Sequence, residues 1–335
     1  MDTEFHFYGI YYLASEAGFH SDDALVLAYS SQYVDHSLVP LRIEFDDHIY
    51  ATEVTQQYRF WDKNQERRVW IPFHFFPGDA ARGAARRTDG AENPFVVTPH
   101  SERVKRFLVS ALEARNLYRV GIALHTYADS WAHQDFTGRW EDFNVVDPQS
   151  TLPAIGHAQV TGKPDDYDST WEDPRLKPEF RLVDNRARTL AAARMIYRYL
   201  CTYNRRNFAD EELVVERLSD IYGKPGEKSA EERRLDLVIE TGAPEYDRLA
   251  WRAEAATLPK NFLSETNESI AEKVGWVREE LRQTAKVIAP RVVPGRPGFP
   301  ESHLYRWNEA VREQRRAAYA ILDDLLSTDV PRSAG

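Results

Sequence analysis

The segment from Leu124 to Asp135 spaces two histidines and an aspartate four residues apart: His125, Asp129 and His133. On an α-helix, residues four apart lie nearly one above another, so the two imidazoles and the carboxylate would project from one face. The apolar residues between Val120 and Ala132 make the helix apolar almost all round, which predicts that it is buried. A chain with this segment must therefore give buried polar side chains their partners, and this spacing is typical of a metal site.

The composition allows a large hydrophobic core. The 335 residues are 42% hydrophobic and 12% aromatic, which is enough for one large domain or two. The single cysteine, Cys201, excludes an internal disulfide and a cysteine-rich zinc site. Any zinc or transition-metal site must then use histidines and carboxylates, and one thiol fits a reducing compartment.

Charge and hydropathy restrict the partners. The N-terminal residues are acidic where a signal peptide would be basic, and no apolar run approaches the ~20 residues of a membrane span. We therefore expect a cytoplasmic protein without a transmembrane segment. A formal net charge of −10 argues against a wide nucleic-acid footprint. The expected partner is a small molecule or a phosphoester substrate, and the sequence leaves the oligomeric state open.

The pattern of apolar residues predicts a mainly α fold, a multi-helix bundle with a small β-hairpin or extended insertion near residues 41–77. We expect residues 1–205 to form a metal-binding helical core and residues 206–335 to add helices that pack on it in one continuous domain. Residues 78–99 read as an exposed loop, and residues 137–177 as a long irregular loop that folds over the site. The expected helices span residues 21–35, 102–116, 117–134, 185–204, 209–222, 230–241, 244–258, 268–288 and 301–326.

Further candidate ligands lie outside the central helix. His74 falls in an apolar run where a charged imidazolium would be costly, so it is either hydrogen-bonded or metal-bound. His157 lies between small residues that allow close approach, with Asp165 as its companion. Aromatic neighbours could pin His6 into the core. Asp35 ends a predicted helix, where a carboxylate opposes the helix dipole and invites a cation, although a solvated end residue is the alternative.

Three segments carry a resemblance to known proteins: Ala28–Asp35, Ile71–Gly78 and Leu124–Gly138. The residues from Val120 through Asp129 to His133 resemble the central helix of the zinc-dependent phospholipase C superfamily, which also holds the zinc single-strand nucleases and the fungal heterokaryon-incompatibility protein. Over roughly residues 1 to 200, the chain is more closely similar to an uncharacterised bacterial family. The superfamily resemblance implies an all-helical fold that holds a zinc cluster, usually of three ions, and cleaves phosphate esters.

The same resemblance implies ligand roles for His74, His125, Asp129, His133 and His157, and a bridging or base role for Asp35. Two positions depart from the superfamily pattern. Secreted members use a processed N-terminal amine as a ligand, so here His6 or Asp2 would have to substitute. Thr161 stands where the pattern has a carboxylate, which leaves Asp165 as a replacement, so we expect one to three ions.

We interpret the chain as a metal-dependent hydrolase, with zinc, that acts on a phosphate ester or phosphodiester through a metal-bound hydroxide. Asp35 would orient or deprotonate the water, and Asp135 would hold an imidazole in one tautomer. One alternative is a non-haem iron oxygenase or oxidase, although the Glu-x-x-His pairs of di-iron bundles do not occur next to the central motif. Another is a non-catalytic interaction protein with a structural metal site.

Overall fold

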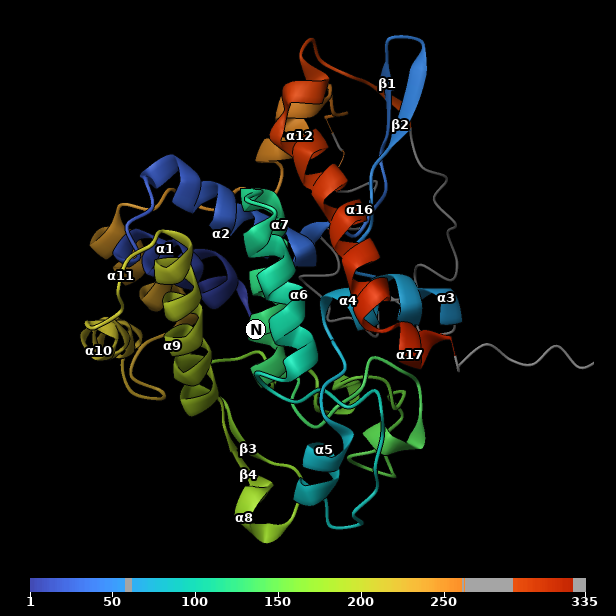
Figure 1. Ribbon diagram of the computed structural model, residues 1–335, viewed down its shortest axis with the longest axis vertical. Helices are drawn as coiled ribbons and strands as arrows, with labels where there is room; N and C mark the ends of the chain where they lie inside the picture. The colour runs from blue at the N-terminus through green and yellow to red at the C-terminus, as the bar shows by residue number, and fades with distance from the viewer. Residues whose placement is uncertain (58–61, 261, 263–291, 328–335) are drawn as a thin grey trace, which may run out of the picture.

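A computed structural model describes residues 1–57, 62–260, 262 and 292–327 (Figure 1). Helices dominate these residues, so the predicted mainly α fold is confirmed. The helices up to residue 132 are η1 (Glu4–Gly9), α1 (Ile10–Glu16), α2 (Ser21–His36), α3 (Lys63–Gln65), η2 (Glu66–Trp70), α4 (Ile71–Phe73), α5 (Ala80–Arg86), α6 (Glu102–Glu113) and α7 (Leu117–Ala132). The later helices are η3 (Asp142–Asn144), η4 (Ala158–Val160), α8 (Pro178–Arg181), α9 (Asn185–Tyr203), α10 (Glu211–Tyr222), α11 (Ala230–Thr241), α12 (Ala250–Ala255), η5 (Phe299–Glu301), α16 (His303–Ile321) and α17 (Asp323–Leu326).

The strands form two small sheets. The first has the order β2 (His48–Ala51), β1 (Arg42–Phe45), β5 (Val292–Pro294). Strands β1 and β2 form the hairpin expected near residues 41–77, and β5 runs parallel to β1. The second sheet pairs β3 (Thr170–Glu172) with β4 (Leu182–Asp184), antiparallel. The hairpin projects at one end of the molecule, and β3 and β4 lie at the other (Figure 1).

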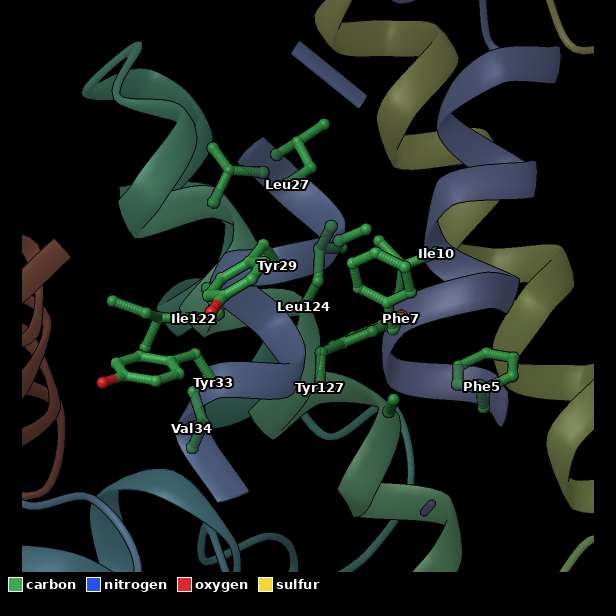
Figure 2. Close-up of a cluster of buried hydrophobic side chains, with 14 of the residues drawn as sticks. Phe5, Phe7, Ile10, Leu27, Tyr29, Tyr33, Val34, Ile122, Leu124 and Tyr127 are labelled. Carbon is green, nitrogen blue, oxygen red and sulfur yellow. The ribbon is translucent and has the colours of Figure 1, made fainter. Parts of the chain in front are cut away.

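Helix α7 runs through the core. Asn116 begins it, because its side chain accepts hydrogen bonds from the backbone amides of Tyr118 and Arg119. From Val120 to Ala132 every residue is buried, as the sequence predicts. Figure 2 shows apolar side chains of α7, α2 and the N-terminal helices packed against one another.

Gly121 brings α2 against α7. A Cβ atom at this position would lie 2.5 Å from the carbonyl oxygen of Leu27 and 2.5 Å from the Cβ of Ser30. Only a residue without a side chain therefore lets the two helices approach so closely. This approach carries the C-terminal end of α2, where Asp35 lies, towards the middle of α7.

The later helices close the core around α7. In α16, which contacts both α6 and α7, the indole of Trp307 is fully buried and donates a hydrogen bond to the carbonyl oxygen of Ser30 at 3.1 Å. The hydroxyl of Tyr12 donates to the carbonyl oxygen of Val214 at 3.1 Å. Residues on both sides of residue 205 thus contribute to one hydrophobic core.

Two local predictions are wrong. The extended structure expected near residues 41–77 does not continue into the run from Val69 to Phe76, because η2 and α4 make that run helical as far as Phe73. A short apolar run fits a buried helix and a buried strand equally well, so its period could not distinguish the two. Residues 78–99 are not an exposed loop either. They contain α5, capped by the side chain of Asp79, and a buried stretch from Phe95 to Thr98.

Other predicted loops and helices agree with the structure over part of their length. Residues 137–177 are largely irregular, as predicted, apart from the short elements η3, η4 and β3. The helix expected over residues 244–258 is shorter, because only α12 forms there, and the helix expected over residues 268–288 lies outside the described residues. Among the described helices, none combines the length and the apolar character that crossing a membrane requires.

Candidate metal centre

Asp129 of α7 lies at the centre of a cluster of histidines and carboxylates. Its Oδ2 is 3.2 Å from Nε2 of His125 and 3.3 Å from Nδ1 of His74. Its Oδ1 is 3.1 Å from Nε2 of His6 and 2.7 Å from the amino nitrogen of Met1. Asp129 is buried. Both of its oxygens therefore meet nitrogen atoms from other parts of the chain.

On one side of Asp129 lies the first triad, which consists of Asp35, His74 and His125. Oδ1 of Asp35 is 3.6 Å from Nε2 of His125 and 3.8 Å from Nδ1 of His74, and the two ring nitrogens are 3.2 Å apart. The ring of His6 stacks on that of His125, with centroids 3.9 Å apart. The ligand atoms of the first triad are close enough together to hold one ion.

On the other side lies the second triad, which consists of His133, His157 and Asp165. Oδ1 of Asp165 is 3.0 Å from Nε2 of His133, and Oδ2 is 3.4 Å from Nε2 of His157. The amino nitrogen of Met1 is 2.9 Å from Oδ1 of Asp165, so it bridges Asp165 and Asp129. The second triad could also hold an ion.

Backbone carbonyl groups fix the tautomers of three of these histidines. The pairs are Nε2 of His74 with the oxygen of Thr55 at 2.8 Å, Nδ1 of His133 with the oxygen of His74 at 2.7 Å, and Nδ1 of His157 with the oxygen of Thr161 at 2.7 Å. A carbonyl oxygen only accepts, so the ring nitrogen in each pair carries a proton and donates it. In a neutral imidazole the opposite nitrogen then presents a lone pair.

Those opposite nitrogens all face carboxylates. Nδ1 of His74 faces Asp129, and Nε2 of both His133 and His157 faces Asp165. A lone pair that faces a carboxylate oxygen is repelled unless a cation or a second proton lies near both. The same hydrogen bonding is typical of metal-binding histidines, which bind the ion through one ring nitrogen and donate the N–H of the other to a backbone carbonyl.

Burial keeps three of the imidazoles neutral. It lowers the pKa of His6 to about 3, with the neighbouring His125 adding to the effect, and it lowers the pKa of His125 to about 4. Burial also lowers the pKa of His157. Neutral imidazole is the form that binds metal ions. Near neutral pH these three side chains are therefore ready to act as ligands.

The carboxylates of the cluster raise the pKa values of two other nitrogen groups, the His133 ring and the Met1 amino group. Burial would lower the pKa of His133, but the carboxylates of Asp129 and Asp165 raise it overall. The same two carboxylates, with Asp35, outweigh burial and raise the pKa of the Met1 amino group to about 11. The carboxylates thus stabilise positive charge on the His133 ring and on the Met1 amino group, as they would stabilise a bound cation.

Solvent reaches some side chains of the cluster but not others. His6, His125 and Asp129 are sealed from solvent, whereas the side chains of Asp35 and Asp165 are 25% and 26% exposed. The two partly exposed carboxylates belong to different triads, and the side chain of His157 in the second triad is also 19% exposed, so solvent reaches a ligand of each triad. A small substrate could therefore approach both triads.

The structure brings together all eight residues that the sequence proposed as ligands: His6, Asp35, His74, His125, Asp129, His133, His157 and Asp165. Segments far apart in the chain supply them, including two π-helical ones: η1 carries His6, and η2 leads into α4 and His74. π-helical turns are rare and are frequent at functional sites.

Asp135 does not join the cluster. Its backbone adopts a φ of +73° just after α7 ends, and its carboxylate pairs with Arg86 at 3.0 Å and with Arg188 at 3.8 Å. The imidazole of His133 is held by the carbonyl oxygen of His74 instead, so the orienting role expected of Asp135 does not match its contacts.

Sequence reasoning missed several groups at the site. It expected His6 or Asp2 to replace an amine ligand, yet the amino group of Met1 lies in the cluster beside His6, while Asp2 accepts a hydrogen bond from the backbone amide of Glu4. It also missed the carbonyl groups of Thr55 and Thr161. Main-chain atoms have no residue identity, so no sequence pattern could have identified them.

The chain matches a family of unknown function, DUF6765, over residues 1–322. It belongs to DUF6765. No curated protein matches it, and no solved structure does. Membership of DUF6765 does not connect the chain to the zinc-dependent phospholipase C superfamily, so that resemblance stays a prediction from the sequence.

Proposed function

We propose that this member of DUF6765 is a metal-dependent hydrolase that binds zinc and cleaves a phosphate ester or phosphodiester. The observation that carries the proposal is the set of three imidazoles that each donate one N–H to a backbone carbonyl and turn the other ring nitrogen towards a carboxylate. Hydrogen bonding of this kind orients metal ligands, and a cation between lone pair and carboxylate removes the repulsion.

Two ions would fit the arrangement, one at each triad. In this proposal Asp129 would contribute to both sites, because Oδ2 faces His74 and His125 while Oδ1 faces the Met1 amino group, which also contacts Asp165. His6 would bind beside Asp129, and the Met1 amino group would supply a further nitrogen after losing its proton. When bound, zinc lowers the pKa of a coordinated water towards ~7 and neutralises charge on phosphate oxygens.

Asp35 is our candidate for the residue that orients or deprotonates the attacking water. Its exposure supports this role, since a base must reach both the water and the solvent. Gln32 supports it further, because its side-chain amide donates to Oδ2 of Asp35 at 3.4 Å and leaves Oδ1 towards the first triad. Asp35 would then take the proton at Oδ1 while Gln32 holds the carboxylate in place, and Oδ2 of Asp129 would complete the ligands of the ion beside His74 and His125.

The ligand chemistry favours zinc over iron. Five neutral or neutralisable imidazoles and three aspartates form the cluster, whereas carboxylate-bridged di-iron bundles use glutamates with Glu-x-x-His pairs. An iron oxygenase is the alternative. Elemental analysis of protein purified without chelator separates the two, and an absorption spectrum under oxygen would reveal iron.

Hydrolysis of bis(4-nitrophenyl) phosphate and of 4-nitrophenyl phosphate by the zinc-loaded protein tests the proposal. We expect the wild type to hydrolyse at least one of them and His125→Ala to lose the activity. A matched control is His20→Ala, because His20 is exposed and lies before α2, away from the cluster.

The deep burial of His6, His125 and Asp129 favours a second reading, a structural ion without catalysis. Wild-type protein that binds zinc stoichiometrically but hydrolyses neither ester would support that reading. Protein that carries no stoichiometric metal would overturn both.

A further inference from the structure

Arg233 of α11 makes a buried ion-pair network far along the chain from the cluster. Its side chain is 2% exposed, and its Nε and Nη2 donate to the two carboxylate oxygens of Glu4 at 2.8 Å and 3.2 Å. Its Nη1 donates to Asp168 at 2.5 Å and to the carbonyl oxygen of Lys228 at 2.7 Å. One guanidinium thus joins three separate segments of the chain.

Two of these segments carry groups of the cluster. Glu4 lies in η1, two residues before His6 and three after Met1, and Asp168 lies three residues after Asp165. Across the cluster, the Met1 amino group faces the carboxylate of Asp165 at 2.9 Å. The separation of these two groups depends on how η1 and residues 165–168 are held relative to each other.

Other contacts hold each segment to a different neighbour. The side-chain amide of Asn185 donates to the carbonyl oxygens of Lys163 and Asp166, which ties the second segment to the start of α9. The hydroxyl of Tyr222 in α10 donates to the carbonyl oxygen of Glu4 at 3.2 Å. Arg233 contacts acidic side chains of both segments at once.

We propose that Arg233 is a positioning residue of the metal centre, which sets the distance between the N-terminal segment bearing Met1 and His6 and the segment bearing Asp165. The inference rests on the proposed metal site. A planar guanidinium with a bidentate carboxylate partner fixes both distance and angle, which a lysine ammonium cannot do. The first triad lies on α2, α7 and the end of α4, and α2 and α4 both pack on α7, whereas α11 packs on η1, α10 and α1.

Zinc titration in competition with a chromophoric chelator tests the inference. For Arg233→Met we expect the zinc equivalent held at the second triad to bind about 10- to 100-fold more weakly, as when a partner that orients a ligand is removed. The equivalent held at the first triad should change by less than about threefold. Arg233→Lys should behave like Arg233→Met, because charge alone does not restore the geometry.

Two further variants keep the test valid if Arg233→Met folds poorly. Asp168→Asn removes one arm of the network and leaves the pair of Glu4 and Arg233 in place, so it should weaken the same zinc equivalent. Arg119→Met is the matched control. Arg119 joins α7 to α16 through Gln314 at 3.0 Å, and its loss should lower the melting temperature without changing either zinc affinity.

Hydrogen exchange of chelator-treated protein gives a readout that does not depend on metal. Residues 2–9 and 163–170 should exchange faster together in Arg233→Met and remain at the wild-type rate in Arg119→Met. Unchanged exchange and unchanged zinc affinity in Arg233→Met would overturn the inference. If the wild type binds no zinc, the proposed function fails, and the exchange rates alone decide whether Arg233 positions the two segments.

Discussion

Asp129 is the residue on which the two triads depend, because it contacts nitrogens of His6, His74, His125 and the Met1 amino group. Burial alone would raise the pKa of its carboxyl group, but His133 and the amino group hold that pKa well below its usual value. The carboxylate is therefore charged at neutral pH and remains available to cations.

The first prediction concerns this charge. Asp129→Asn keeps the shape of the side chain but removes its charge and replaces one acceptor oxygen with a donor, so we expect zinc affinity to fall at least about 100-fold at both triads. Elemental analysis after dialysis, together with zinc titration, measures the loss. His20→Ala is the control, and Asp129→Asn protein that retains two ions at wild-type affinity would contradict the contribution of Asp129 to both sites.

The second prediction concerns the pH dependence of stability in metal-free protein. Burial lowers the pKa of His6 to about 3, so between pH 6 and 4.5 the unfolded chain binds a proton there that the folded chain does not. His6 therefore makes the free energy of unfolding fall as pH falls, by about 1.4 kcal/mol per pH unit.

The difference between the wild type and His6→Leu isolates this contribution, since the raised pKa of Asp2 works in the opposite direction over the same range. Urea unfolding at several pH values measures it. We expect the slope of stability against pH to be smaller in His6→Leu. Equal slopes would show that His6 is protonated in the folded protein.

At the scale of elements, the contact of α2 with α7 decides where the first triad forms. The two helices touch at Gly121, and the C-terminal end of α2 then lies beside the turn of α7 that bears His125. Helix propensity and apolar periodicity predict both helices, but neither predicts which turn of one helix meets which turn of the other.

The third prediction tests this contact. Gly121→Ala should destabilise the protein by about 1–3 kcal/mol, because the new methyl group meets the backbone of α2, even though alanine is the better helix former by about 1 kcal/mol. Zinc affinity at the first triad should fall as well, since Asp35 moves with α2.

Urea unfolding measures the first effect and zinc titration the second. Gly162→Ala is the control. A Cβ atom there meets nothing within 4 Å, so stability should change by less than about 0.5 kcal/mol. A Gly121→Ala protein that is more stable than the wild type would show that α2 can shift without cost.

At the scale of the whole molecule, the cluster joins parts of the chain that are far apart in the sequence. Its ligands come from η1, α2, the end of α4, α7 and residues 157–165, and Arg233 connects two of these segments to α11. In the proposed function, ion binding therefore couples to the folding of nearly the whole described chain rather than to one local loop.

The fourth prediction follows from this coupling. A ligand that binds only the folded state stabilises it, by about 2.7 kcal/mol at a concentration 100 times its Kd. Zinc at that concentration should raise the melting temperature by several degrees, and chelator should reverse the rise. Calorimetry measures the shift. His125→Ala should show a much smaller rise, and an equal rise in both proteins would place zinc elsewhere.

The sequence by itself determined a buried helix with His125, Asp129 and His133 on one face, because helical periodicity is a local property of the chain. It also indicated the remaining histidines and carboxylates of the cluster, from their apolar, aromatic or small neighbours, from the end of a predicted helix and from the family resemblance. Only the tertiary structure decided how they meet. The carbonyl groups that fix the imidazole tautomers, the Met1 amino group at the cluster and the network around Arg233 depend on packing between distant segments, for which the sequence carries no local signal. Asp135 shows the same limit, because a backbone turn after α7 directed it to Arg86 rather than to an imidazole.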